Sequence, residues 1–158
     1  MDSDTFRSVL GRFASGVTIL TARDASGTDH GMTVSAFCSA SLEPPLVLFC
    51  VDRTASMYPL LTSDPSRACG ISILSSDQEA YSRRFADETD QRFEGIAYSR
   101  GEHGVVLLDD ALAHLECTIV ERLEAGDHTV CVARLDRAEP RHGQPLLYYR
   151  GGYAQLER

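Results

Sequence analysis

A hydroxyl-rich extended segment, a double-proline turn and an apolar strand follow one another between residues 30 and 52. Residues 30–39 carry small and hydroxyl-bearing side chains in a β-branched setting, and residues 46–51 are apolar almost throughout. Pro44 and Pro45 stiffen the turn and so restrict how the two strands lie relative to each other. Small side chains let a flat ligand approach the backbone, and hydroxyl groups can bond to it. The pattern predicts a preformed edge for a small molecule.

Short segments with strand character recur along the rest of the chain. An amphipathic helix is expected over residues 5–15, ended by Gly16, and residues 86–104 are polar and aperiodic, which predicts a surface loop. The segment 46–51 is expected to be a strand buried on both faces. The remaining expected elements are short helices at 56–61 and 78–85 and strands at 17–22, 32–38, 68–73, 115–123, 129–138 and 146–149.

Many antiparallel strands with few helices favour a barrel, because closure removes the exposed sheet edges that would otherwise recruit other chains. A chain of 158 residues with 43% hydrophobic content is enough for one closed core, so a single domain over residues 1–158 is expected.

The charge of the chain argues against nucleic acid as a partner. The chain has 15 basic residues, every one of them Arg, and 23 acidic residues, so its formal net charge is −8. Nucleic-acid binding normally requires a basic patch that displaces counterions. The apolar runs are far too short for a membrane helix, and the acidic first residues do not form a secretory signal. A cytoplasmic protein with no membrane partner is expected.

The five cysteines are scattered singly, with no C-x-x-C pair and no matching histidine spacing. Such cysteines in apolar strands act as small hydrophobic side chains, so neither a metal site nor a disulfide framework is expected. Cys38 is set apart because it lies beside the proposed ligand edge.

Four stretches together resemble the flavin reductase-like family. They are residues 30–52, residues 73–78 with Arg84, Phe85 and Ala86 behind them, Gly126-Asp127-His128, and residues 145–153. Each stretch is a weak match alone, but their order along nearly the whole chain is specific. The resemblance implies a mainly β fold, an antiparallel split β-barrel that binds FMN, with a short N-terminal helix and peripheral helices.

The resemblance also assigns ligand-binding positions. It implies that Thr33, Val34, Ser35 and Ala36 line the isoalloxazine ring, with Ser39 nearby. The ribityl chain and phosphate would be held by residues of the next strand and turn, namely Cys50, Val51, Asp52, Arg53 and Ser56. The later pair Arg84 and Phe85 would face the flavin. The residue pattern alone also allows a solvent-facing strand at 33–36, and a surface Arg53 followed by a helix N-cap.

His128 is the most specific single candidate for a functional residue. A histidine at a hairpin tip is often merely exposed, but the Gly-Asp-His setting in this family implies a histidine over the open face of the flavin. We expect His128 to orient the nicotinamide and not to act as an obligatory proton donor. Tyr148, Tyr149 and Tyr153 could stack on a ring or on a neighbouring subunit, but core or interface packing is the expected role, because an aromatic side chain carries a large apolar area.

The function that the resemblance implies is NAD(P)H-dependent flavin reduction. Hydride would pass to FMN or FAD, and the reduced flavin would leave for a partner flavin-dependent monooxygenase, which requires weak, exchangeable flavin binding. A homodimer in which the second subunit completes the pocket is also implied. Two alternatives remain: a non-catalytic flavin- or haem-binding split barrel, and a flavoenzyme of the pyridoxamine-phosphate-oxidase type. The choices between FMN and FAD, and between NADH and NADPH, are left open.

Overall fold

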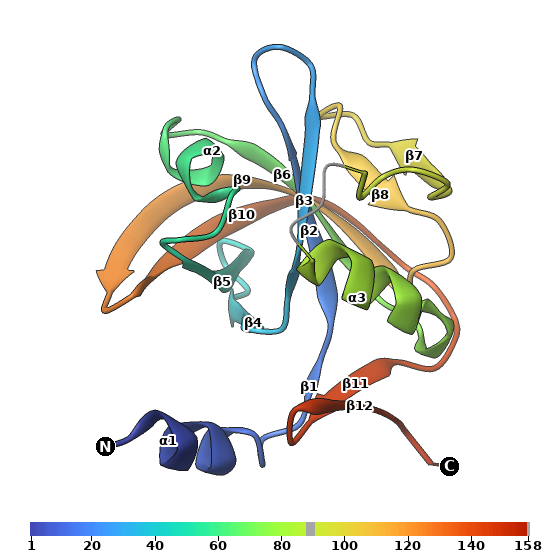
Figure 1. The fold of residues 1–158 in the computed structure, drawn as a ribbon. Coiled ribbons are helices and arrows are strands. Elements are labelled where there is room, and N and C mark those ends of the chain that lie inside the picture. Colours follow the sequence, from blue (N-terminus) through green and yellow to red (C-terminus); the bar gives the residue numbers. More distant parts are fainter. Residues whose placement is uncertain (88–90, 158) are drawn as a thin grey trace.

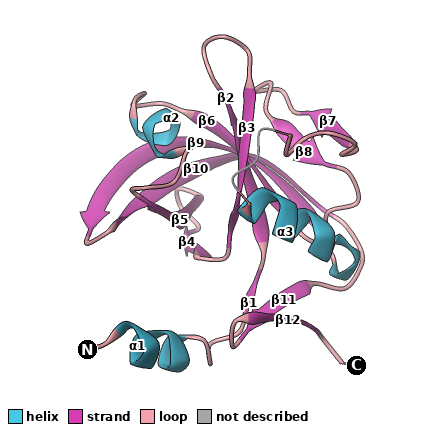
Figure 2. Ribbon diagram, viewed as in Figure 1, coloured by secondary structure: helices cyan, strands magenta, loops and turns pink. Residues whose placement is uncertain are grey.

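The computed structural model describes residues 1–87 and 91–157, and the chain is mainly β, as expected (Figures 1 and 2). The helices are α1 (Ser3–Leu10), α2 (Tyr58–Thr62), η1 (a 3₁₀ turn, Ser76–Gln78) and α3 (Glu79–Ala86). The strands are β1 (Ser15–Gly16), β2 (Thr18–Arg23), β3 (Asp29–Val34), β4 (Phe37–Ser41), β5 (Leu46–Asp52), β6 (Ala68–Ile73), β7 (Tyr98–Arg100), β8 (Val106–Leu108), β9 (Ala113–Ala125), β10 (His128–Pro140), β11 (Leu146–Tyr149) and β12 (Gly152–Gln155).

Seven strands form one antiparallel sheet in the order β3-β2-β6-β9-β10-β5-β4. Its two outer strands, β3 and β4, are consecutive in the chain and are joined only by Ser35 and Ala36. The sheet must therefore curl until its two edges meet at this link, where the amide of Cys50 on β5 donates to the Ala36 carbonyl at 3.0 Å. No ladder pairs β3 with β4 within the described residues, so the curled sheet keeps a seam.

Two smaller sheets flank the large one. Strands β1, β11 and β12 form a three-stranded sheet in the order β1-β11-β12, and β7 pairs with β8. The amide of Arg150, in the β11–β12 turn, donates to the carbonyl of Gly11 at 2.8 Å, which ties the end of α1 to this sheet. Figure 1 shows α1 and the β1-β11-β12 sheet below the large sheet.

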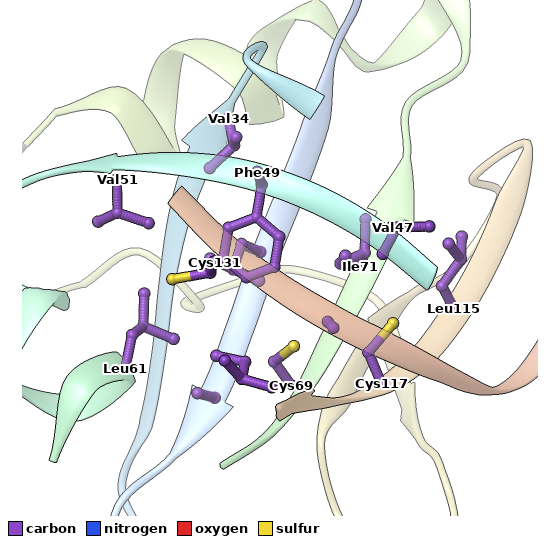
Figure 3. Packing of buried hydrophobic residues seen from close by; sticks show 14 of the residues in the cluster. Val34, Val47, Phe49, Val51, Leu61, Cys69, Ile71, Leu115, Cys117 and Cys131 are labelled. Atoms are coloured by element: carbon purple, nitrogen blue, oxygen red, sulfur yellow. The ribbon is translucent and has the colours of Figure 1, made fainter. Parts of the chain in front are cut away.

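The core lies inside the curled sheet (Figure 3). Val47, Phe49 and Val51 point into it and are at most 6% exposed, whereas the residues between them are only partly buried. The expectation that β5 is buried on both faces is therefore wrong. A strand of an antiparallel sheet that covers the core with one face has one inner and one outer side, so burial alternates along it.

Three cysteines fill this core among the aliphatic side chains. Cys69 on β6 and Cys117 on β9 are directly opposite each other, and Cys131 lies on β10 (Figure 3). All five cysteines are free. Burial raises the pKa of Cys131 to about 11, so its thiol is uncharged at neutral pH, as a hydrophobic role requires.

A second apolar cluster packs α3 against β2, β8 and β11. Phe85 of α3 is 1% exposed, and its ring lies edge-on to Phe93 with centroids 5.1 Å apart. The ring also covers Gly31 of β3, where a Cβ atom would lie 2.6 Å from a Phe85 ring carbon. A glycine at this position lets α3 approach β3 closely.

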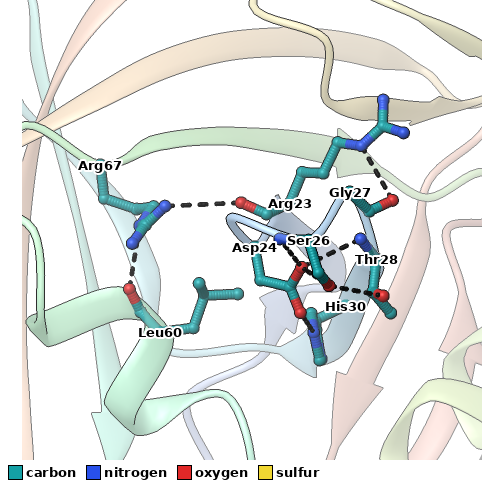
Figure 4. Close-up of polar contacts among 8 residues, drawn as sticks. All are labelled: Arg23, Asp24, Ser26, Gly27, Thr28, His30, Leu60 and Arg67. Atoms are coloured by element: carbon teal, nitrogen blue, oxygen red, sulfur yellow. Dashed lines mark hydrogen bonds and ion pairs between the residues drawn. The ribbon is translucent and has the colours of Figure 1, made fainter.

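The β2–β3 turn is organised by one carboxylate (Figure 4). Asp24 accepts from the amides of Ser26 and Thr28 and pairs with the ring of His30 at 2.9 Å. The Ser26 hydroxyl, followed by His30, holds the pKa of Asp24 well below its usual range. Arg67 donates to the carbonyls of Leu60 and Arg23, which links this turn to α2.

Two expected boundaries are wrong. Helix α1 ends at Leu10 with Gly11 as its C-cap, not near Gly16, and begins after Asp2, whose carboxylate accepts from the Thr5 amide at 2.8 Å. The expected loop over 86–104 contains β7, and its residues 88–90 lie outside the described residues.

The expected strand 32–38 is interrupted at 35–36, where the chain crosses from one sheet edge to the other. No helix among the described residues has the length and apolar character needed to cross a bilayer.

Candidate functional site

The seam of the curled sheet gathers the predicted ligand-binding residues into two groups. Thr33 and Ser35 lie on one side, next to α3, and Asp52 and Arg53 lie on the other, where β5 ends. The link at Ala36 joins the two sides, because its carbonyl accepts from Cys50, two residues before Asp52. Residues from β3 and from the end of β5 are thus brought to the same seam of the curled sheet.

The first group lines a pocket of about 200 Å³. Thr33 and Ser35 contribute to it together with side chains that the sequence did not identify as ligand-binding: Val17, Ser82, Ala86, Tyr148 and Tyr153. The Thr33 hydroxyl donates to the Ser82 carbonyl at 2.6 Å and so fixes β3 to α3. The Ser35 side chain is exposed, and its hydroxyl makes no hydrogen bond to the described part of the chain. It remains available to a ligand.

The second group lies around the tip of the β9–β10 hairpin. His128 opens β10 opposite Asp52, the last residue of β5. The ring nitrogen Nδ1 of His128 lies 2.8 Å from the Asp127 carboxylate, and the His128 side chain is 42% exposed. The backbone amide of Thr54, then its hydroxyl, lowers the pKa of Asp52, and the nearby His128 adds to this effect. The tip therefore carries one exposed imidazole between two carboxylates.

Arg53 and Ser56 follow β5 on the surface. The Arg53 guanidinium lies 3.5 Å from the Glu124 carboxylate, with both side chains well exposed, and the Arg53 amide donates to the Asp127 carbonyl at 3.0 Å. Exposed ion pairs of this kind are weak and exchange readily, so a phosphate can compete for the guanidinium. Ser56 does not cap α2, whose N-cap is Met57.

Three predicted residues have buried side chains. Val34, Val51 and Phe85 are each at most 4% exposed and belong to the apolar clusters. A ligand at the seam could reach the first two only through their backbone groups. The ring of Phe85 packs against Phe93 instead of facing the pocket.

The remaining predicted residues lie on the outer surface. Arg84 donates to the backbone carbonyl of Glu94, which ties α3 to residue 94. Ser39 on β4 is exposed, whereas Cys50 is half-buried. Burial raises the pKa of the Cys50 thiol, and the neighbouring Cys38 adds to the shift, so a thiolate at Cys50 is disfavoured at neutral pH.

Sequence reasoning missed Ser82 and treated Tyr148 and Tyr153 as packing residues. Ser82 is completely buried in α3, and no local signal marks it. The two tyrosines lie within the 145–153 stretch that carries part of the family resemblance, and that stretch was the available signal.

The arrangement suits a flat, uncharged ring with a phosphate-bearing tail. Hydroxyl-bearing, aromatic and small apolar side chains line the pocket, and Arg53 follows the end of β5, the strand that the Cys50–Ala36 hydrogen bond joins to this side of the seam. Within residues 1–87 and 91–157, no group of three or more His, Cys, Asp or Glu side chains is placed to hold a metal ion.

Comparisons with known proteins identify the family of the chain. Residues 10–157 match the family model for the flavin reductase like domain. An NADH-dependent flavin reductase of Rhodococcus sp is 43% identical over 153 residues, covering 96% of this chain and 85% of that protein. The reductase component of a 4-nitrophenol 4-monooxygenase/4-nitrocatechol 2-monooxygenase of Rhodococcus opacus is 38% identical over 156 residues, covering 99% and 82%.

A solved structure extends the agreement to the fold. The NADH:FAD oxidoreductase of Streptomyces globisporus, in complex with NAD and FAD fragments, aligns with a TM-score of 0.93 at 35% identity and covers 99% of this chain and 93% of that chain. On its sequence and its fold, the chain belongs to the flavin reductase-like domain family.

Proposed function

We propose that this chain is an NADH:flavin oxidoreductase that reduces FMN or FAD and releases the reduced flavin to a partner monooxygenase. The observation that carries the proposal is the seam. The pocket lined by Thr33 and Ser35 lies on one side of the Ala36–Cys50 hydrogen bond, and β5 leads on the other side to the exposed guanidinium of Arg53 and, opposite Asp52, to the exposed imidazole of His128. A bound flavin would supply the hydride and electron chemistry, so the protein needs only to orient the ligands and control access to the flavin, and supplies no reacting group itself.

Each residue at the seam then has a positioning task. The Ser35 hydroxyl and the backbone of residues 34–36 would bond to the polar edge of the ring, and Arg53 would hold the phosphate in exchange for Glu124. The exposed His128 would orient the nicotinamide over the open face of the flavin. Because the pocket is shallow and the Arg53 ion pair is exposed, flavin binding would be weak enough for release.

A kinetic assay tests this function directly. The purified chain is mixed with NADH or NADPH and with FMN, FAD or riboflavin in turn, and loss of reduced-nicotinamide absorbance is followed. We expect turnover with NADH and sequential kinetics, because flavin acts as a dissociating substrate. Parallel ping-pong lines would instead indicate a retained flavin. Flavin binding without turnover would favour a carrier or sensor, and the absence of both would overturn the proposal.

We also propose a homodimer whose second subunit completes the pocket. Helix α1 buries none of its residues, and its apolar side chains Phe6, Val9 and Leu10 are each more than 50% exposed, as is Phe13 beyond it. On the outer face of β9, Val120 and Leu123 are also exposed. Two separate apolar surfaces on one chain favour reciprocal contact between two copies.

The dimer proposal is tested by multi-angle light scattering at micromolar protein. A mass twice that of the chain is expected, and Phe6→Ser with Val9→Ser should shift the mass toward the monomer and reduce flavin affinity. Arg7→Gln, on the same helix, serves as the control. A monomeric wild type that reduces flavin normally would refute the shared pocket.

The setting that we propose is a single domain over residues 1–158 acting in the cytoplasm. All five cysteines are free, including the exposed Cys38, which is typical of a reducing compartment. The partner would be the oxygenase of a two-component system, a role supported by the nitrophenol monooxygenase reductase component among the relatives.

A further inference from the structure

The pocket beside α3 carries an aromatic wall that the proposed function has not used. Tyr148 of β11 and Tyr153 of β12 line it together with the hydroxyl-bearing residues of β3 and α3. Its volume of about 200 Å³ is below the roughly 300–1,000 Å³ of pockets that enclose a whole small-molecule ligand. The pocket therefore has room for one ring system of a larger ligand.

Tyr153 is held in place by contacts within the chain. Its phenol oxygen lies 2.7 Å from the Ser82 hydroxyl, and the guanidinium of Arg83 lies 4.8 Å from the centre of its ring. Since Thr33 also donates to the Ser82 carbonyl, these bonds connect β12, α3 and β3 around the pocket. Tyr153 therefore holds β12 against α3, and its phenol hydroxyl already has Ser82 as a hydrogen-bond partner.

Tyr148 is different because its ring keeps free surface. It meets Tyr153 edge-to-face, with centroids 5.5 Å apart and planes at 65°, and it remains 37% exposed. The contact with Tyr153 restricts the orientation of the Tyr148 ring, so little side-chain entropy is lost when a ligand contacts it. Packing within the chain does not explain the exposed part of this ring.

We propose that Tyr148 forms an aromatic contact with the planar, electron-poor heteroaromatic ring that enters this pocket. The electron-rich face of a phenol favours such a ring, in an offset or edge-on arrangement. The isoalloxazine of an oxidised flavin and the pyridinium ring of the product NAD+ share this chemistry, whereas the dihydropyridine ring of NADH is not aromatic. The inference rests on the proposed function for the presence of either ligand. It assigns Tyr148 a ligand contact in addition to any packing role.

The neighbouring Tyr149 provides a matched control. It is 41% exposed, a value close to that of Tyr148, but it alternates to the other face of β11 and does not line the pocket. Replacing each tyrosine with Leu keeps apolar area on the strand and removes the aromatic ring. Tyr148→Phe keeps the ring and loses only the hydroxyl.

Flavin binding is measured without nicotinamide by titrating FMN and following its fluorescence, which a stacked tyrosine quenches. If isoalloxazine enters the pocket, Tyr148→Leu should weaken FMN binding by roughly three- to tenfold and relieve the quenching, the size expected for one aromatic pair. Tyr148→Phe should retain wild-type affinity, and Tyr149→Leu should match the wild type in both measurements.

If the nicotinamide of NAD+ enters instead, FMN affinity should stay constant in Tyr148→Leu while the inhibition constant of the product NAD+ rises by a similar factor. Either result supports the contact and identifies the ring. The inference fails if the wild type reduces flavin while Tyr148→Leu and Tyr149→Leu give the same FMN affinity, fluorescence and NAD+ inhibition constant. A wild type that neither binds FMN nor oxidises NADH refutes the proposed function itself, which is a distinguishable result.

Discussion

His128 lies directly opposite Asp52 in the antiparallel pairing of β10 with β5. This register places the tip of the β9–β10 hairpin beside the end of the strand that leads to Arg53. The imidazole has Asp127 as its hydrogen-bond partner and remains 42% exposed, so it is held at the hairpin tip without being buried. A group in this position can contact a second ligand that arrives after the first.

Replacing His128 with Ala should raise KM for NADH by roughly three- to tenfold, because one orienting contact of about 1 kcal/mol is lost. Flavin affinity should change little, since the role proposed for the imidazole is to orient the nicotinamide and not to bind the flavin. Steady-state kinetics at saturating FMN and a separate flavin titration provide the two measurements. His142→Ala, an exposed histidine away from the hairpin tip, is the control. An unaltered KM for NADH would exclude the role.

Arg53→Gln should weaken FMN binding by roughly three- to tenfold and leave riboflavin binding unchanged, because only FMN carries the phosphate that the guanidinium would hold. Glu124→Gln should have the opposite effect on FMN, since it removes the carboxylate that competes for Arg53 at 3.5 Å. Titration of both flavins against each variant checks this, with Arg141→Gln as the control. Equal losses for FMN and riboflavin would argue against a phosphate contact.

Gly31→Ala should destabilise the fold by about 1–3 kcal/mol, the usual cost of overpacking. The added Cβ atom would lie 2.6 Å and 2.8 Å from two ring carbons of Phe85 and 3.0 Å from Phe93, so α3 or β3 must move. Gly16→Ala is the matched control because nothing lies within 4 Å of its added Cβ atom. Urea unfolding of both variants measures the difference, and equal stabilities would show that α3 is not packed as closely as described.

Asp136→Asn should lower the free energy of unfolding by about 1–3 kcal/mol at neutral pH. Burial raises the pKa of Asp136, but hydrogen bonds from Thr118, Arg134 and His103 outweigh it, and the pKa lies below its ordinary value. A carboxylate with a depressed pKa stabilises the fold above the pKa of the unfolded chain, near pH 4, and loses this contribution as pH falls through the folded pKa.

The difference between Asp136→Asn and the wild type should therefore shrink on acidification below about pH 4. Urea unfolding over a pH series tests this. Glu121→Gln is the control, because Glu121 is exposed on β9 and is expected to show no comparable loss at neutral pH. A difference that is independent of pH would mean that the Asp136 charge contributes nothing.

The local pattern of residue types was sufficient to predict the positions of most strands and of the short helices. Alternating β-branched residues mark β2 and β6, and the Gly-Asp turn before His128 marks the long hairpin. Pattern failed at the end of α1, where apolar spacing continues to Phe13 although the helix stops at Leu10. It also failed on β5, because an apolar run does not reveal whether one or both faces are covered.

The sequence by itself determined the family, the strand-rich class and the short stretches that carry ligand-binding residue types, since these depend on local composition and order. Only the tertiary structure decided that Phe85 packs beneath Gly31, that Ser82 pairs with Tyr153, and that Tyr148 keeps an open ring. The first two relationships join segments about 50 and 70 residues apart, and they depend on how α3 packs against β3 of the large sheet and β12 of the small sheet. Strand register and curvature set such distances, and no local stretch of residues encodes them.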